Sequence, residues 1–375
     1  MEKNTNPLYI LRFIAAIIVV LFHFSPPATY KELNFLIKNG GEAVNFFFFL
    51  SGFVMIISNT KTYFVGNNNY FSKSAFYVKR IARIYPLYFF ALLGQVFFHY
   101  RIHLIDTPTV KYRLPFEFFG IQRWLYAGSF NSPGWTISCE FFFYLFFPFI
   151  IVYMRKKMNR FTVFALAYFV ISIIATSILF YLSKQSLAPV EKQIVSSLYK
   201  NPIFLISTFI YGMLCGKLYI ENKITFFNNK WNSRLSIVVC VFAIFLFKYY
   251  IEGGILSSGI LSPLYFVLVM AITSFKNNET TIFNSKLFIF LGNISFGVYI
   301  LQSPISNYFT YYITKIYDSY SLLFFVFTLI IFASISYYII EIPFKKLIQN
   351  CYYKTRSLKK EKEMKQTTEA INPIL

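Results

Sequence analysis

The chain has 375 residues, of which 57% are hydrophobic and 14% charged, and its formal net charge is +21. A soluble protein of this length needs far more polar surface than this composition supplies, so a water-soluble protein is excluded. Apolar runs of about 20 residues recur along the chain, and a helix of that length spans the hydrocarbon core of a bilayer. The sequence therefore predicts an all-α, multi-pass membrane protein.

These runs predict about ten transmembrane helices, with both termini in the cytoplasm. The helices form one integral-membrane domain, residues 1–345. Residues 346–375 are charged and lack an apolar face, so we expect a basic, flexible cytoplasmic tail that the chemistry does not need. The predicted spans are residues 8–25, 44–60, 81–99, 135–153, 161–183, 201–220, 235–250, 257–275, 287–309 and 321–343.

The positive charge follows this topology. Of the 36 lysines and arginines, 24 fall on the inner side of the predicted spans and 11 on the outer side. Such an excess at the cytoplasmic face is what the positive-inside rule predicts. We therefore expect the basic residues to set the orientation and to attract anionic membrane lipids, and we expect no nucleic-acid partner.

Two ionisable residues lie on one stripe of the first span. Arg12 and His23 are eleven residues apart, and eleven helical steps return to the same face within about 20° and rise about 16 Å. An ionisable side chain inside a membrane helix is costly and is by default a functional candidate. The stripe predicts a site that extends across much of the bilayer.

A second pair of cations is predicted near the cytoplasm. Arg80 and Arg83 are three residues apart where the third span begins, so they share one face at a helix N-terminus. Helix N-termini and arginine side chains both favour phosphate, which makes the pair a candidate clamp for a phosphorylated cytosolic ligand. Spacing alone favours the alternative that these arginines only snorkel and fix orientation.

The outer layer holds the candidate base. Glu140 lies one to two turns into the fourth span, at a depth similar to that of His23. A histidine oriented by a carboxylate can act as a general base in acyl transfer to a hydroxyl. A lone membrane histidine is more often an interfacial or packing residue, and this alternative stays open.

Other polar positions have simpler interpretations. Ser51 with Gly52, and the segment LGNISFGVY, are typical of close helix packing. Glu341, at the inner end of the last span, can pair with an inner arginine. The long outer connection 100–134 suits a lid or an acceptor-binding surface, and equally a solvated loop. The four cysteines have no metal-ligand spacing, so we expect no metal.

Together these segments resemble the acyltransferase 3 family of integral-membrane bacterial O-acyltransferases over roughly residues 8–345. Arg12 with His23 matches its first-helix signature, and VKRIARIYPLY matches its Arg-x-x-Arg signature. The remaining matches are FFFFLSGFVM, SPGWTISCEFFFYLFFP, LGNISFGVYILQSPI and IEIPFKK.

The resemblance implies an acyltransferase that transfers groups other than amino-acyl groups. Its implied reaction is O-acetylation, with cytosolic acetyl-CoA as donor. The acceptor is a hydroxyl of a surface polysaccharide or its lipid-linked precursor (O-antigen, lipopolysaccharide or capsule), at the bacterial inner membrane. The implied roles are catalysis for His23, donor binding for Arg12, Arg80 and Arg83, and site or structural roles for Glu140, Ser51, Trp135 and Ser138.

One position departs from the family pattern. Many members have a histidine where this chain has Gln302, so either that position is not essential to transfer here or acceptor recognition differs. A transporter or flippase of a glycan or lipid-linked intermediate is the alternative function. It explains the spans and buried charges equally well, but it leaves His23 without a role.

Overall fold

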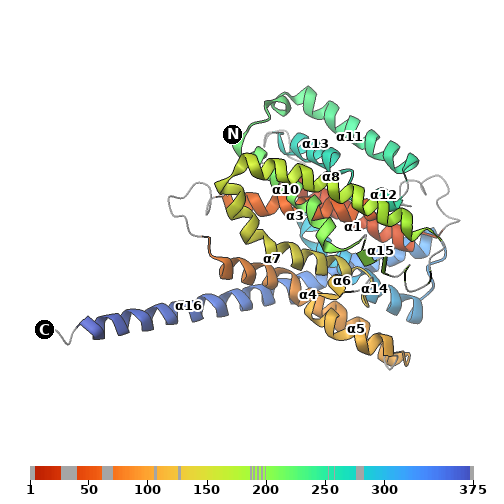
Figure 1. The fold of residues 1–375 in the computed structure, drawn as a ribbon. Coiled ribbons are helices and arrows are strands. Elements are labelled where there is room, and N and C mark those ends of the chain that lie inside the picture. The colour runs from red at the N-terminus through yellow and green to blue at the C-terminus, as the bar shows by residue number, and fades with distance from the viewer. Residues whose placement is uncertain are drawn as a thin grey trace.

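The protein is described from a computed structural model, in which every regular element of the described residues is a helix (Figure 1). The structure describes residues 5–26, 40–60, 71–104, 108–125, 128–185, 188, 191, 194–195, 197–198, 200–251, 253–256, 258–275 and 283–371.

Nine helices in this part of the chain are long and apolar enough to cross a membrane. The all-α, multi-pass prediction is therefore confirmed, and each of the nine matches one predicted span in order. They are α1 Pro7–Phe24, α3 Gly41–Thr60, α4 Lys73–Arg101, α7 Gly134–Lys156, α8 Met158–Ser183, α10 Pro202–Glu221, α11 Lys230–Tyr250, α14 Lys286–Tyr312, and α15 Ser319–Ser336 with its continuation.

The eighth predicted span, 257–275, is shorter than expected. Its main helix is α13, Ser262–Thr273, which is about 18 Å long and too short to cross the hydrocarbon core alone. The short α12, Gly253–Leu256, precedes it. Gly259 adopts a φ of +89° between the two, and its missing side chain leaves room for the Thr208 hydroxyl. This glycine turn interrupts the apolar run that the sequence presents as continuous.

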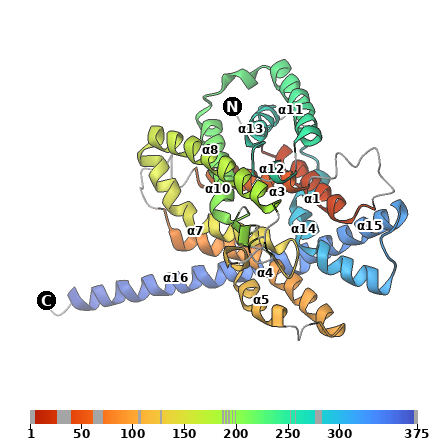
Figure 2. The ribbon, with the colours of Figure 1, turned by 45° about the vertical axis from the view of Figure 1, so that its right-hand side comes forward.

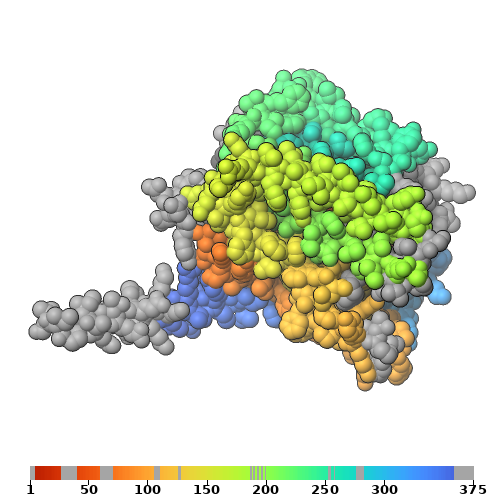
Figure 3. Space-filling view, viewed as in Figure 1, coloured from red at the N-terminus to blue at the C-terminus, as the bar shows by residue number. Residues whose placement is uncertain are grey.

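Part of the lateral surface of the helix bundle is apolar. Helices α8 and α11 lie at the periphery, and Figure 3 shows both on one face of the molecule. Only 22% of the apolar window of α8 and 11% of that of α11 is buried. Their exposed side chains include Val170, Ile174 and Phe242. A hydrocarbon environment therefore suits these two helices.

The tightest helix crossing joins α3 and α10. A Cβ added to Gly52 would lie 2.0 Å from the Phe209 carbonyl oxygen, and one added to Gly212 would lie 2.0 Å from the Phe49 carbonyl oxygen. Each backbone thus packs directly against a glycine of its neighbour, as small residues allow in membrane helices. The packing role predicted for Gly52 is confirmed.

The predicted packing face of the ninth span is confirmed as well. Gly292 of α14 lies against Tyr9 of α1, where an added Cβ would be 2.4 Å from the Tyr9 Cβ. Gly297 faces Ala333 of α15, at 3.2 Å between Cβ positions. Helix α14 therefore holds α1 on one side and α15 on the other.

A proline inside α14 creates a link to the outer connection. Pro304 has no N–H, so the Ile300 carbonyl lacks its usual helical donor. The Asn131 side-chain amide donates to that carbonyl at 3.2 Å. The segment before α7 is thereby attached to α14 one turn before Pro304.

The long outer connection is folded rather than a plain solvated loop. It contains α5, Pro108–Phe119, and α6, Gln122–Leu125. The buried Glu117 carboxylate accepts hydrogen bonds from the Ser129 hydroxyl at 2.8 Å and from the Phe130 amide. Tyr88 of α4 donates its hydroxyl to the Glu117 carbonyl at 2.5 Å. The connection is therefore fixed on the ends of the bundle helices that the sequence assigns to the outer side, and we keep the terms inner and outer in that predicted sense.

The last span does not end at the Glu-x-Pro segment. Helix α15 passes through a π-helical turn, Tyr337–Glu341, into α16, Ile342–Ile371, which extends away from the bundle (Figures 1 and 2). Pro343 lies just after this turn, where its missing N–H and its ring disfavour α-helical hydrogen bonding. The boundary predicted at residue 345 thus falls inside a helix, and a flexible, dispensable tail over 346–375 stays a prediction.

Candidate active site

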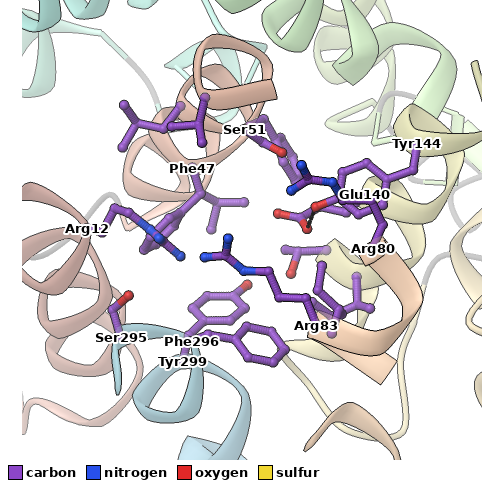
Figure 4. Close-up of a pocket in the computed structure, with 17 residues that line it drawn as sticks. Arg12, Phe47, Ser51, Arg80, Arg83, Glu140, Tyr144, Ser295, Phe296 and Tyr299 are labelled. Atoms are coloured by element: carbon purple, nitrogen blue, oxygen red, sulfur yellow. Dashed lines mark hydrogen bonds between the residues drawn. The ribbon is translucent and has the colours of Figure 1, made fainter. Parts of the chain in front are cut away.

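A cavity lies between five helices, and we call it the arginine cavity; its empty space, open solvent included, is about 820 Å³. Figure 4 shows the Arg12 and Arg83 guanidinium groups pointing into it, with the Glu140 carboxylate across from them beside Arg80. Glu140 is the one acidic residue among the described lining residues, so the cavity carries an excess of positive charge. Its lining is Arg12, Val44, Phe47, Phe48, Leu50, Ser51, Val54, Arg80, Arg83, Ile84, Thr136, Ile137, Glu140, Tyr144, Ser295, Phe296 and Tyr299.

Arg80 is held in place by α3 and by its own helix. Its Nη2 donates to the Ser58 hydroxyl at 3.3 Å, and its guanidinium lies 5.5 Å from the centre of the Phe76 ring. Its Nε is buried without a partner in the described structure. The side chain is therefore fixed at one end and still has a donor available to an anion.

The expected helix N-terminus at Arg80 and Arg83 is wrong. Helix α4 begins at Lys73, because the Ser72 side chain caps it by accepting from the Ala75 amide. The two arginines thus lie two to three turns inside the helix, where the backbone N–H groups are already bonded. Anion binding there depends on the guanidinium groups and not on the helix dipole.

Glu140 lies with the arginines rather than at the level of His23. The Tyr144 hydroxyl donates to the Glu140 carboxylate at 2.6 Å, and Ser51 lies against the same hydroxyl. The carboxylate is close enough to Arg12, Arg80 and Arg83 to interact with each electrostatically. The expected His23–Glu140 pair is therefore wrong as a contact, and a catalytic role for Glu140 stays a prediction.

His23 lies in the last turn of α1 and is not among the residues that line either cavity described here. Its ring is exposed and packs edge-on against Phe22, at 4.9 Å between ring centres. Ala16 and Val19 lie between it and Arg12 on the same face and are almost completely buried. A donor arm running straight along this stripe is therefore blocked by packed side chains, and the arginine cavity follows α3 and α7 instead.

The arginine cavity nevertheless approaches the outer level of His23. Val44 and Thr136 line it, and each lies within one turn of the outer end of its helix. Gly40, next to the start of α3, lies directly against Phe22 of α1. The outer end of the cavity, at Val44, is thus about one turn of α3 from the level of Phe22 and His23.

Ser138 and Trp135 fix the outer connection on α7. The Ser138 hydroxyl accepts from the Arg123 amide at 3.1 Å, and its carbonyl accepts from the Trp124 indole at 2.9 Å. The Arg123 guanidinium lies 5.4 Å from the centre of the Trp135 ring. These contacts give both residues a structural role in the family's Trp–Ser–Glu segment.

Gln302 is buried in α14, and in the described structure only one of the two polar atoms of its side chain has a hydrogen-bond partner. Its side-chain amide donates to the Tyr299 carbonyl at 2.7 Å, whereas its side-chain oxygen has no partner in the described structure. Tyr299 lines the arginine cavity, one turn before Gln302. Gln302 therefore lies behind the cavity wall rather than in the lining.

A second cavity, of about 920 Å³, lies at the inner ends of the helices. Arg12, Val54 and Arg83 line both cavities, so the two meet at these side chains. Glu341 faces the second cavity near Arg12 and Arg83, without an ion pair within 4 Å in the described residues. The remaining lining is Thr5, Leu8, Tyr9, Asn293, Tyr337, Ile342 and Lys345.

Tyr144 is a site residue that the sequence analysis missed. It lies four residues after Glu140, so helical spacing alone could have placed the two side chains together. The donor role of its hydroxyl is recognised only from the structure, in which Ser51 and the arginines lie around it. The buried carboxylate of Glu117, far from this cavity, was missed for the same reason.

The comparisons identify the family. A family model described as "Acyltransferase domain" matches residues 8–341. The chain belongs to the acyltransferase 3 family. It is a membrane acyltransferase, and this result favours the enzyme over the alternative of a transporter. No solved structure gives a significant match to the chain.

Relatives with curated names agree with this assignment. The chain is 31% identical to the acyltransferase MdmB of Streptomyces mycarofaciens over 158 residues, or 39% of each protein. A protein of Acidianus two-tailed virus named as an acetyltransferase is 25% identical over 80% of this chain and 83% of its own. A Staphylococcus aureus (strain COL) protein named as an O-acetyltransferase is 21% identical over 90% of this chain, which spans 56% of that relative.

Removing the hydroxyl of Tyr144 should destabilise the protein measurably. In Tyr144→Phe the Glu140 carboxylate loses its short hydrogen bond inside the bundle, which should cost about 1.5–3 kcal/mol. Tyr77→Phe is a matched control, because its hydroxyl donates to the neutral Leu145 carbonyl at an exposed position. Unfolding of the purified protein in detergent measures both, and equal losses for the two variants would contradict the assigned hydrogen bond.

Proposed function

We propose that this acyltransferase moves an acetyl group from cytosolic acetyl-CoA to a hydroxyl of a surface polysaccharide or its lipid-linked precursor. The enzyme would act in the cytoplasmic membrane of a bacterium. The relatives named as O-acetyltransferases support the acetyl group and the hydroxyl acceptor. The single observation that carries the proposal is a cationic cavity that lies between the bundle helices and follows α3 from Val54 to Val44.

The cavity suits a donor with phosphates at one end and an acyl thioester at the other. Arg12, Arg80 and Arg83 present planar sets of donors that match phosphate oxygens. The pantetheine arm of coenzyme A has about twelve bonds between phosphate and sulfur, the length of four extended residues or about 14 Å. That reach is close to the rise of about 15 Å along α3 between Val54 and Val44, two residues that line the cavity.

The proposed chemistry uses His23 as the general base. The imidazole accepts the proton of the acceptor hydroxyl, and the oxygen attacks the thioester carbonyl. The C–O bond forms, the C–S bond breaks, and the imidazolium returns its proton to the departing sulfur. Attack by His23 itself, through an acyl-histidine, is the second route compatible with the same residues.

The wall of the arginine cavity supplies the second requirement of transfer, exclusion of water. Phe47, Phe48 and Phe296 line it together with aliphatic side chains. A thioester arm in such surroundings is shielded from hydrolysis, and the interactions of the arginines with phosphate are stronger there than in water.

The test is transfer by the purified full chain in lipid nanodiscs. Acetyl-CoA and surface glycan from a strain lacking the gene are supplied, and mass spectrometry follows the gain of one acetyl group per modified sugar. NMR of the polysaccharide from parent and deletion strains gives the matching result in cells. Unchanged acetyl esters on every envelope glycan of the deletion strain, with altered glycan export, would overturn the proposal in favour of transport.

A further inference from the structure

The second cavity has a composition that the reaction at His23 does not explain. Arg12, Arg83 and Lys345 face it with one carboxylate, Glu341, so it carries an excess of positive charge. It also contains two phenol rings, those of Tyr9 and Tyr337. Cationic side chains that only fix the orientation of a membrane protein do not require aromatic rings across a cavity from them.

Lys345 enters this cavity because of the π-helical turn. The turn ends at Glu341, and α16 starts in a new register, with Ile342 and Lys345 both on the cavity side. Lys345 is exposed, and no hydrogen bond or ion pair holds its ammonium group in the described structure. Its neighbour Lys346 does not line the cavity. An ammonium group held on a helix and open to a cavity is available to an anionic ligand.

Glu341 does not neutralise this group. The carboxylate faces the same cavity, but its Oε1 is buried without a donor in the described structure, and no ion pair within 4 Å joins it to Lys345. Arg83 is the cation with the strongest electrostatic effect on it. This one carboxylate interacts electrostatically with Arg83, Arg12 and Lys345, so its single negative charge is shared among three cations and the cavity keeps an excess of positive charge.

The two tyrosines suit a planar ring. Tyr9 and Tyr337 are close enough to affect each other electrostatically, and both are half-buried in the wall. Phe290 supports Tyr337 edge-on at 6.4 Å between ring centres. Aromatic side chains held in this way are stacking surfaces for nucleobases.

We infer that the second cavity holds the nucleotide half of the donor and that Lys345 binds its 3′-phosphate. This rests on the proposed function, which makes coenzyme A the carrier. The adenine lies against Tyr9 and Tyr337, and the diphosphate lies at the junction beside Arg83. The arm then enters the arginine cavity. Lys345 thereby selects a donor with a 3′-phosphate over one without it.

The experiment compares binding of coenzyme A and 3′-dephospho-coenzyme A to the full chain in lipid nanodiscs. The parent protein should bind coenzyme A about tenfold or more tightly, which is the effect of one charge-assisted hydrogen bond. Lys345→Ala should bind both ligands equally. Lys345→Arg should restore the preference, and Lys346→Ala, the matched control, should keep it. Thermal unfolding of each variant checks that the fold is intact.

The outcomes separate the two proposals. An unchanged preference in folded Lys345→Ala overturns the role of Lys345 and leaves the acetyltransferase standing, because coenzyme A still binds. Equal loss of preference in Lys345→Ala and Lys346→Ala overturns it too, since general surface charge would then be the cause. A parent protein that binds neither ligand contradicts coenzyme A as donor and the proposed function with it.

Discussion

His23→Ala should reduce acetyl transfer by about 10²–10⁴-fold, the range expected when a general base is removed. The protein should still fold, because the ring is exposed and no hydrogen bond in the described structure depends on it. Transfer to purified glycan in nanodiscs gives the rate. Membrane abundance and thermal unfolding give the stability, and both should match those of the parent.

His103 provides the control for this experiment. It is an exposed histidine of the outer connection with a φ of +57°, so asparagine, which tolerates that conformation, is the suitable replacement. His103→Asn should leave transfer unchanged. A folded His23→Ala protein with the parental rate would remove His23 from the chemistry, and the outer end of the arginine cavity would need another base.

Gly212→Val should prevent the protein from folding. Its Cβ alone would lie 2.0 Å from the Phe49 carbonyl oxygen, so α3 and α10 would have to separate. The loss should exceed the roughly 1–3 kcal/mol typical of an overpacked core, because the obstruction is backbone that no rotamer change can move. Gly52→Val should fail equally, since the Phe209 carbonyl oxygen stands at the same distance from its added Cβ.

Gly94 is the matched position at which a side chain fits. An added Cβ there would meet only the Pro304 side chain, at 3.7 Å, an ordinary contact. Gly94→Ala should fold normally and gain up to about 1 kcal/mol from the lower entropy of its unfolded chain. Size-exclusion profiles of fluorescently tagged variants separate the outcomes. A monodisperse Gly212→Val peak at parental abundance would show that the crossing is looser than described.

The sequence predicted most of the fold because hydrophobic length determines membrane spans almost by itself. Nine spans appear where the apolar runs place them. The eighth failed because one glycine turn, at Gly259, is invisible in a hydropathy pattern. The start of α4 was predicted too late, because the polar residues from Lys73 onward are typical of a loop. In the structure Ser72 caps a helix that begins at Lys73.

The sequence predicted which residues line the candidate site better than it predicted which of them lie close together. Arg12, Arg80 and Arg83 line one cavity, in agreement with their predicted grouping in one layer. Glu140 lies one to two turns into its helix, as predicted, but its neighbours are Tyr144 and the arginines rather than His23. Relative register between antiparallel helices depends on packing, which a single sequence does not contain.

Composition could not decide whether the outer connection is a folded segment or a solvated loop. Its charged residues suit a lid and a loop equally, yet Glu117 is completely buried and Arg123 nearly so. Burial of such groups requires partners from distant parts of the chain, such as the Lys200 carbonyl that accepts from the Arg123 Nε. Those partners are defined only by the tertiary structure.

The bond between Asn131 and Ile300 exists only because Pro304 leaves a carbonyl vacant. A proline, which interrupts helical hydrogen bonding, here permits a contact between two distant parts of the chain. Pulling the segment before α7 away would leave the carbonyl of the buried Ile300 without a donor. Movement of α14 at this point is therefore coupled to movement of the segment before α7.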